Sequence, residues 1–153
     1  MKKIIAMIAA AAMAAAMLSG CGQEMTPACA PITEKIISDI AIEDMALVDA
    51  ERISNYLPAD MDKVEEFSLY ICGNGGFADE VGVFRMKDAK DTAALAQAIS
   101  DRINERRDVF ESYNPDEFAK LNETVINTRD RYVFYAVCSD TAAAEKIFND
   151  SFK

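Results

Sequence analysis

The segment RYVFYAVC, residues 131–138, places the strongest constraint on how this chain folds. From Tyr132 to Val137 successive residues are apolar, so a strand formed there is apolar on both faces. Such a strand suits the centre of a sheet rather than its edge. The preceding segment ETVINT, residues 123–128, predicts its hairpin partner, with a turn at Arg129 and Asp130.

A second hairpin is predicted from an alternating segment and the run that follows it. In EFSLYIC, residues 66–72, Phe67, Leu69 and Ile71 point to one side, which indicates a half-buried strand. The residues GNGG at 73–76 interrupt it, and EVGVFRM at 80–86 supplies the partner strand. We expect a loop built from residues that tolerate positive φ.

Helical periodicity appears in several of the remaining segments. A long helix is expected over residues 89–111, where Arg106 interrupts an apolar stripe and is expected to pair with an acidic residue. Shorter helices are expected at 33–40, at 50–57 behind an Asp49 cap, from Pro115 at a first helical position, and behind an Asp140 cap. Residues 41–48 carry mixed signals and are expected to be irregular.

These elements together predict an α+β fold. The two hairpins would form an antiparallel four-stranded sheet, with the helices packed mainly on one face as a two-layer sandwich. The size of the chain suits one such domain, which we expect over residues 32–153.

The N-terminus has the features of an export signal. Lys2 and Lys3 precede an apolar stretch that runs to Leu18, and a helix of this length would reach only about 22 Å, short of the roughly 30 Å hydrocarbon core of a bilayer. The residues LSGC at 18–21 resemble the lipobox of bacterial lipoproteins. That resemblance implies cleavage between Gly20 and Cys21 and lipidation of the Cys21 thiol. The alternative is a plain signal peptide with an incidental cysteine.

Three segments are therefore expected: a lipoprotein signal peptide at 1–20, a lipidated flexible tether at 21–31, and the folded domain at 32–153. Two acyl chains would hold the domain stably on the membrane, since each buried CH₂ contributes about 0.8 kcal/mol. We expect a protein on the extracytoplasmic face of the cell membrane, with a monomeric domain.

Net charge excludes one class of partner. The formal charge is −10, and removal of Lys2 and Lys3 with the signal would make it −12. No basic patch remains that could follow a phosphate backbone, so we expect no nucleic-acid partner. The acid excess is typical of a soluble exposed surface, with a surface for basic peptides or cations as the less favoured interpretation.

Cysteine and histidine content limits the chemistry. The chain has no histidine, which excludes histidine bases, Ser-His and Cys-His pairs and histidine-bound zinc. Export would permit a disulfide between Cys72 and Cys138, but their spacing suggests no disulfide framework, and free, partly buried thiols are favoured.

Two further segments are expected to carry no ligand site. GNGG lacks the Lys and Ser or Thr of a phosphate-binding loop, and the acidic residues at 60–66 lack the spacing of a calcium loop. We therefore assign no catalytic residues, no metal site and no cofactor.

Three segments taken in order resemble a known family. ADEVGVFRMKDAKD, FESYNPDEFAKL after the long helix, and RYVFYAVCSD together resemble the small bacterial lipoproteins grouped as domain of unknown function 4358, over about residues 34–153. The resemblance implies export, lipidation and occurrence mainly in Gram-positive bacteria. It supplies no activity and no catalytic residues.

The sequence favours a binding or interaction module of the cell envelope, whose partner is an envelope protein or a small ligand, over an enzyme. The competing hypotheses are a hydrolase that uses carboxylates alone and an accessory subunit of a membrane transporter. A deep cleft with two facing carboxylates would favour the hydrolase, whereas a shallow apolar patch would favour the binding module.

Overall fold

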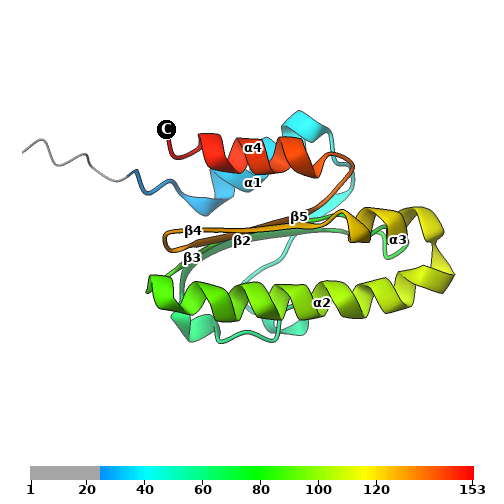
Figure 1. The fold of residues 1–153 in the computed structure, drawn as a ribbon, viewed down its shortest axis with the longest axis horizontal. Coiled ribbons are helices and arrows are strands. Elements are labelled where there is room, and N and C mark those ends of the chain that lie inside the picture. The colour runs from blue at the N-terminus through cyan, green and yellow to red at the C-terminus, as the bar shows by residue number, and fades with distance from the viewer. Residues whose placement is uncertain (1–24) are drawn as a thin grey trace, which may run out of the picture.

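A five-stranded antiparallel sheet forms the middle layer of the molecule, in the order β1-β2-β3-β5-β4 (Figure 1). The structure is a computed structural model that describes residues 25–153. Its strands are β1 (Met45–Leu47), β2 (Val64–Cys72), β3 (Glu80–Met86), β4 (Val125–Arg129) and β5 (Tyr132–Val137). Its α-helices are α1 (Cys29–Ile40), α2 (Thr92–Tyr113), α3 (Pro115–Asn122) and α4 (Thr141–Asp150). The predicted α+β class is confirmed.

The two predicted hairpins meet at the centre of the sheet. β3 pairs with β2 on one side and with β5 on the other, so that Val83 lies opposite both Ser68 and Phe134. Every residue of β5 is buried, as expected for a central strand. The β4–β5 turn places Asp130 in the left-handed region, at φ 50°.

The prediction of four strands was wrong, because residues 45–47 add a fifth. This short segment pairs antiparallel with the outer edge of β2, with Met45 opposite Cys72 and Leu47 opposite Tyr70. Two of its three residues are exposed, so the strand has no apolar alternation that would have indicated it. It is an edge strand of the short kind that limits further pairing.

The prediction of two layers was also wrong, because helices cover both faces of the sheet. In Figure 1, α1 and α4 lie above the sheet and α2 lies below it. Val81 and Val83 of β3 pack with α1 and α4, whereas Phe84 packs with α2 and the segment before β2. The apolar residues of β3 and β5 point alternately to the two sides, and each side therefore needs its own cover.

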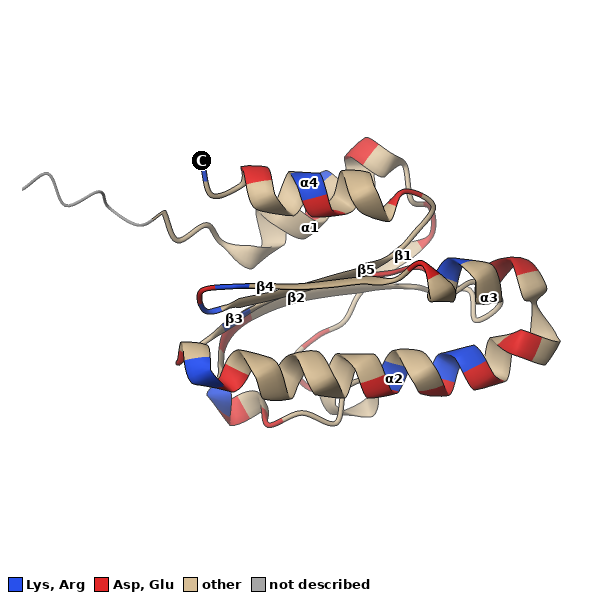
Figure 2. Ribbon diagram, viewed as in Figure 1, with Lys and Arg blue, Asp and Glu red and all other residues tan. Residues whose placement is uncertain are grey.

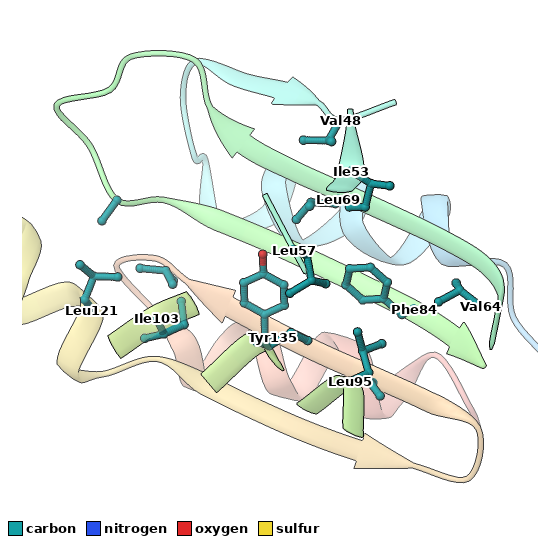
Figure 3. Close-up of a cluster of buried hydrophobic side chains, with 14 of the residues drawn as sticks. Val48, Ile53, Leu57, Val64, Leu69, Phe84, Leu95, Ile103, Leu121 and Tyr135 are labelled. Carbon is teal, nitrogen blue, oxygen red and sulfur yellow. The ribbon is translucent and has the colours of Figure 1, made fainter. Parts of the chain in front are cut away.

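The larger of the two apolar clusters lies between the sheet and α2 (Figure 3). From α2 it receives Leu95, Ile99 and Ile103, at the four-residue spacing that predicted the helix. The segment before β2 closes its side with Ile53 and Leu57, around a 3-10 turn at Ile53–Asn55 where a longer helix was expected. Asp49 Oδ1 accepts from the Arg52 amide at the start of this turn.

The flexible tether was predicted too long, because α1 begins at Cys29. Its first amide donates to Glu66 Oε1 at 2.8 Å, which joins the helix start to β2. Before it, the carbonyl oxygen of Pro27 accepts from the Tyr132 hydroxyl at 2.8 Å and from Arg85 Nη1 at 3.5 Å. These contacts attach the chain to the domain five residues before the expected boundary at 32.

The molecule has two distinct ends along the strands. The N-terminal pole is the end where Pro27 is held and where the β4–β5 turn lies. α1, β2 and α2 all run from this pole to the opposite end, where the β2–β3 loop and α3 lie (Figure 1). At 1.5 Å per residue, α2 alone spans about 33 Å between them.

Within residues 25–153, no helix has the length and apolar character needed to cross a bilayer. The predicted signal peptide, the Gly20–Cys21 cleavage point and the lipidated Cys21 lie outside the described residues.

Candidate functional site

A cavity of about 290 Å³ lies at the end of the sheet opposite the N-terminal pole. We call this end the pocket pole. The walls come from four places: the α1–β1 connection, the β2–β3 loop, α3 and the end of β5. The lining residues are Ala41, Ile42, Glu43, Asp44, Cys72, Phe77, Asp79, Glu117, Lys120 and Ser139.

Lys120 is held between two carboxylates on one wall of the cavity. Its ammonium donates to Asp79 Oδ2 at 2.8 Å and to Glu117 Oε1 at 2.9 Å. Burial disfavours the charge on Lys120, but the hydrogen bonds to Asp79 and Glu117 outweigh burial and raise its pKa above the usual value. The ammonium therefore stays charged at neutral pH.

Contacts from α2 and α3 fix the β2–β3 loop. Glu117 Oε2 accepts from the amide of Ala78 at 2.7 Å, and the side chain of Asn114 donates to the carbonyl of Gly76 at 3.1 Å. On the other side, the amide of Gly73 donates to the carbonyl of Asp44 at 2.8 Å. The loop is thus bonded to three neighbouring elements, so the cavity wall is ordered before any ligand binds.

The glycines of this loop differ from the expectation in one respect. We expected a loop built from residues that tolerate positive φ, yet among residues 25–153 no glycine has a positive φ. The left-handed residues near the cavity are Ala41 and Asp44, at φ 57° and 56°. They turn the chain sharply between α1 and β1 and bring Asp44 to the cavity.

A buried ionic cluster lies between β3 and α2, next to the loop. Glu80, which is 1% exposed, accepts from Arg102 Nη2 and from Arg106 Nη1, both at 2.6 Å. Its second oxygen accepts from the hydroxyl of Tyr135 at 2.8 Å. Arg106 Nη1 also donates to the carbonyl of Ala78 at 2.9 Å. Arg106, which interrupts the apolar stripe of α2, therefore neutralises the carboxylate of Glu80 on β3 and supports the β2–β3 loop.

Two groups of this cluster have displaced pKa values. Burial and the charge of Glu80 raise the pKa of the Tyr135 hydroxyl well above its usual value. Burial alone would lower the pKa of Arg102, but its hydrogen bonds to Glu80 and the charge of that carboxylate raise it instead. Both shifts favour a neutral tyrosine and a charged arginine around Glu80, which is an arrangement that stabilises the fold.

Three exposed apolar side chains lie at the pocket pole. Phe77 lines the cavity and is 45% exposed, while Val109 and Tyr113 on α2 are 63% and 67% exposed. Val109 and Tyr113 lie one helical turn apart on the same side of α2. The Tyr113 hydroxyl lies close to Gly76, since a Cβ placed on that glycine would be 3.9 Å from it. We call Phe77, Tyr113 and Val109 the apolar strip.

A sequence comparison places this chain in a family. The model of a family described as "Domain of unknown function (DUF4358)" matches residues 38–138. The chain belongs to the DUF4358 family. No curated protein and no solved structure matches it. The matched segment runs from the last turn of α1 to the residue after β5, and so holds the whole sheet and every lining residue except Ser139.

The cysteines that this DUF4358 chain places in the described residues are all free. Cys72 is half-buried and lines the cavity, whereas Cys138 is buried. Cys72 is the last residue of β2 and Cys138 directly follows β5, and β3 lies between these two strands. Two strand spacings amount to roughly 9.5 Å, which exceeds the separation of about 4.4–6.8 Å between the Cα atoms of a disulfide. The geometry favours the free thiols that the sequence favoured.

The acidic segment before β2 in this DUF4358 chain has structural partners. Asp60 accepts from the amide of Asp62 at the start of a 3-10 turn, while Glu65 and Glu66 pair with Arg85. No group of three or more acidic, cysteine or histidine side chains is arranged for a metal ion in the part of the chain that the structure describes.

Sequence reasoning missed the residues of the cavity. Asp79, Glu117 and Lys120 were not singled out, and only the three-residue spacing of Glu117 and Lys120 on one helix was visible in advance. Asp79 joins them across 41 residues of sequence. Sequence alone offered no signal for that approach.

Proposed function

We propose that this DUF4358 chain is a lipid-anchored binding module of the cell envelope, exposed on the extracytoplasmic face. In this proposal Cys21 carries the lipid and the cavity at the pocket pole receives the partner. The signal features of residues 2–21 support the anchor. The observation that carries the binding role is the position of the cavity, at the pole farthest from the point where the chain joins the domain.

Chain length determines how the domain would stand on a membrane. Six residue steps separate Cys21 from Pro27, so a fully extended chain would keep the N-terminal pole within about 20 Å of the lipid. The length of α2 adds about 33 Å between the N-terminal pole and the pocket pole. When the domain is anchored in this way, its cavity can point away from the membrane surface and contact partners there.

The charges in the cavity support binding rather than carboxylate hydrolysis. A glycan-cleaving pair needs one carboxyl group that is protonated at working pH and a second that is ionised. Asp79 and Glu117 instead both bond to the single ammonium of Lys120. Both carboxylates are thus engaged by a side chain of the chain itself.

The anchor is tested by metabolic labelling with a fatty acid. Wild type should incorporate the label, and Cys21→Ala should give an unprocessed precursor without it. Cys29→Ala is the matched control, since it removes a cysteine eight positions away that lies at the start of α1, and it should label normally. Continued labelling of Cys21→Ala would refute the lipid anchor.

The binding role is tested by affinity capture from membranes solubilised in a mild detergent. Phe77→Ala removes an exposed aromatic side chain from the cavity, and Met25→Ala removes a similarly exposed apolar side chain near the N-terminal pole. A genuine partner should be lost with Phe77→Ala and retained with Met25→Ala. Retention of every captured protein by both variants would contradict a binding site at the cavity. A captured transporter subunit would identify the accessory role as the form that the binding takes.

A further inference from the structure

We propose that the pocket pole binds a segment of another polypeptide that carries lysine or arginine next to apolar residues. The cationic side chain would enter the cavity, and its apolar neighbours would lie on the apolar strip. This inference rests on the proposed binding function and specifies the chemistry of the partner.

The cavity selects for positive charge. Four carboxylates and one ammonium line it, which gives a net charge of −3 at neutral pH. Asp79 and Glu117 are occupied by Lys120. Glu43 and Asp44, by contrast, are exposed, and their carboxylates make no hydrogen bond or ion pair with any residue of 25–153. These two side chains are available to a cation from outside.

Further unpaired carboxylates surround the cavity and the apolar strip. Glu111 at the end of α2, Asp116 at the start of α3 and Glu123 after α3 are exposed, and within the described part of the chain none of them forms an ion pair. Figure 2 shows acidic positions at both ends of α3 and at the end of α2. An approaching basic segment is attracted to this pole, and the attraction weakens as salt is added.

Several acidic groups of the N-terminal pole, by contrast, are held in ion pairs. Glu65 accepts from Arg85 at 3.1 Å and from Arg131 at 2.7 Å. Asp91 accepts from Lys63 at 3.0 Å. These ion pairs neutralise Glu65 and Asp91 inside the molecule, whereas Glu43 and Asp44 at the cavity remain available to a cationic partner.

The apolar strip indicates a polypeptide rather than a small cation. The cavity holds about 290 Å³, at the lower limit of small-molecule sites, and it opens next to Phe77. Tyr113 and Val109 are also exposed, and the Tyr113 hydroxyl lies near Gly76, the residue before Phe77, so exposed apolar side chains are present at this pole outside the cavity as well. A polyamine would use the carboxylates and leave this surface uncovered, whereas a peptide chain covers both. The aromatic ring of Phe77 is placed to contact a cation in the cavity.

The test measures peptide binding to the full chain purified in a non-ionic detergent. The probe is a fluorescent peptide of lysine, leucine and glycine, and its counterpart has glutamate in place of lysine. Anisotropy titrations should show saturable binding of the lysine peptide only, with weaker binding as sodium chloride is raised. Equal binding of both peptides, or binding of neither, would overturn the proposal.

Charge variants locate the site. Glu43→Gln with Asp44→Asn should weaken binding by about three-fold or more, since each exposed ion pair is worth roughly 0.2–1 kcal/mol. The matched control is Glu51→Gln with Asp130→Asn. It removes the same charge elsewhere, and like the first pair it includes an aspartate of positive φ, where asparagine is tolerated. Equal weakening by both pairs would show a general charge effect and refute the site.

Variants of the apolar strip separate a peptide from a polyamine. Phe77→Leu should weaken peptide binding by about two- to five-fold through loss of the cation–aromatic contact, and Met25→Ala should leave it unchanged. If spermine binds with the same dependence on Glu43 and Asp44 while the lysine peptide does not bind, the polypeptide proposal is wrong. In that case, affinity capture of a partner that is lost with Phe77→Ala would still support the proposed binding function.

Discussion

Replacement of Glu80 by glutamine tests whether the buried ionic cluster holds α2 on the sheet. The substitution keeps the shape of the side chain but removes its charge. Glu80 accepts four hydrogen bonds: from Arg102 at 2.6 and 3.2 Å, from Arg106 at 2.6 Å and from Tyr135 at 2.8 Å. A glutamine amide would turn two N–H donors toward groups that are themselves donors, and would leave two guanidinium groups without a counter-charge.

The magnitude follows from burial. Removal of one partner from a buried ion pair costs about 3–5 kcal/mol. The side chains of Arg102 and Arg106 are 16% and 19% exposed, so water reaches them and relieves part of the penalty. We therefore expect Glu80→Gln to lower the free energy of unfolding by about 3 kcal/mol, a large share of the roughly 5–15 kcal/mol of a typical domain.

Urea unfolding followed by circular dichroism measures this loss. The midpoint should fall while the slope of free energy against urea stays unchanged, since the surface exposed on unfolding is the same. Glu65→Gln is the matched control: it breaks ion pairs of Arg85 and Arg131, but its side chain is 42% exposed, and it should lower the urea midpoint much less than Glu80→Gln does. Similar losses for the two variants would refute the reasoning.

Four further predictions concern the backbone and the thiols. Gly82→Ala should lower the free energy of unfolding by about 1–3 kcal/mol, because the new methyl carbon would lie 2.5 Å from the ring of buried Tyr135; thermal unfolding that matches wild type would contradict this packing. Ala41→Gly should stabilise by about 0.5–1 kcal/mol, because Ala41 ends α1 in the left-handed region, and a loss of stability in urea would contradict the assignment. In thiol labelling of the folded chain, half-buried Cys72 should react well before buried Cys29, and equal rates would argue against the burial of Cys29. Burial, followed by a neighbouring carboxylate, raises the pKa of Cys29 from 9.0 to about 12. The stability that its protonated form contributes is present below pH 9 and is lost as the pH rises toward 12, so Cys29→Ala should lack this part of the alkaline loss, and an unchanged alkaline profile would contradict the shift.

Elements with strong local patterns were predictable. The strand at 80–86, the apolar spacing of α2, Pro115 at a helix start and the Asp140 cap all appear as expected, because each depends on residues within a turn or a few strand positions. α2 begins at Thr92 rather than at 89, where a 3-10 turn precedes it. Only the position where the helix begins differs from the prediction, and the type of element is as predicted.

The number of layers could not be predicted from any single strand or helix. Tyr132–Val137 is apolar on both faces, and such a strand needs cover on both faces. The helix periodicities showed which side of each helix is apolar but not which face of the sheet it covers. Ile36 of α1 and Phe148 of α4 could equally have joined Leu95 of α2 on one side.

The cavity and β1 depended on long-range contacts. Met45–Leu47 has no alternation of its own and is a strand because the outer edge of β2 was open to pair with it. Lys120 reaches Asp79 because α3 packs beside the β2–β3 loop. Contacts of this kind depend on the whole fold, and a single sequence does not encode them locally.

The strand order has a consequence for how the chain acquires its structure. β3 lies at the centre of the sheet, yet one of its partners is β5, and α2, α3 and β4 lie between them in the chain. A nascent chain that ends before Val125 has one side of β3 unpaired and Phe84 without Val133 opposite it. Pairings between distant segments form late and slow folding. The domain therefore reaches its native state only after its C-terminal strands have emerged, and until then the edge of β3 that β5 covers stays open to other partners.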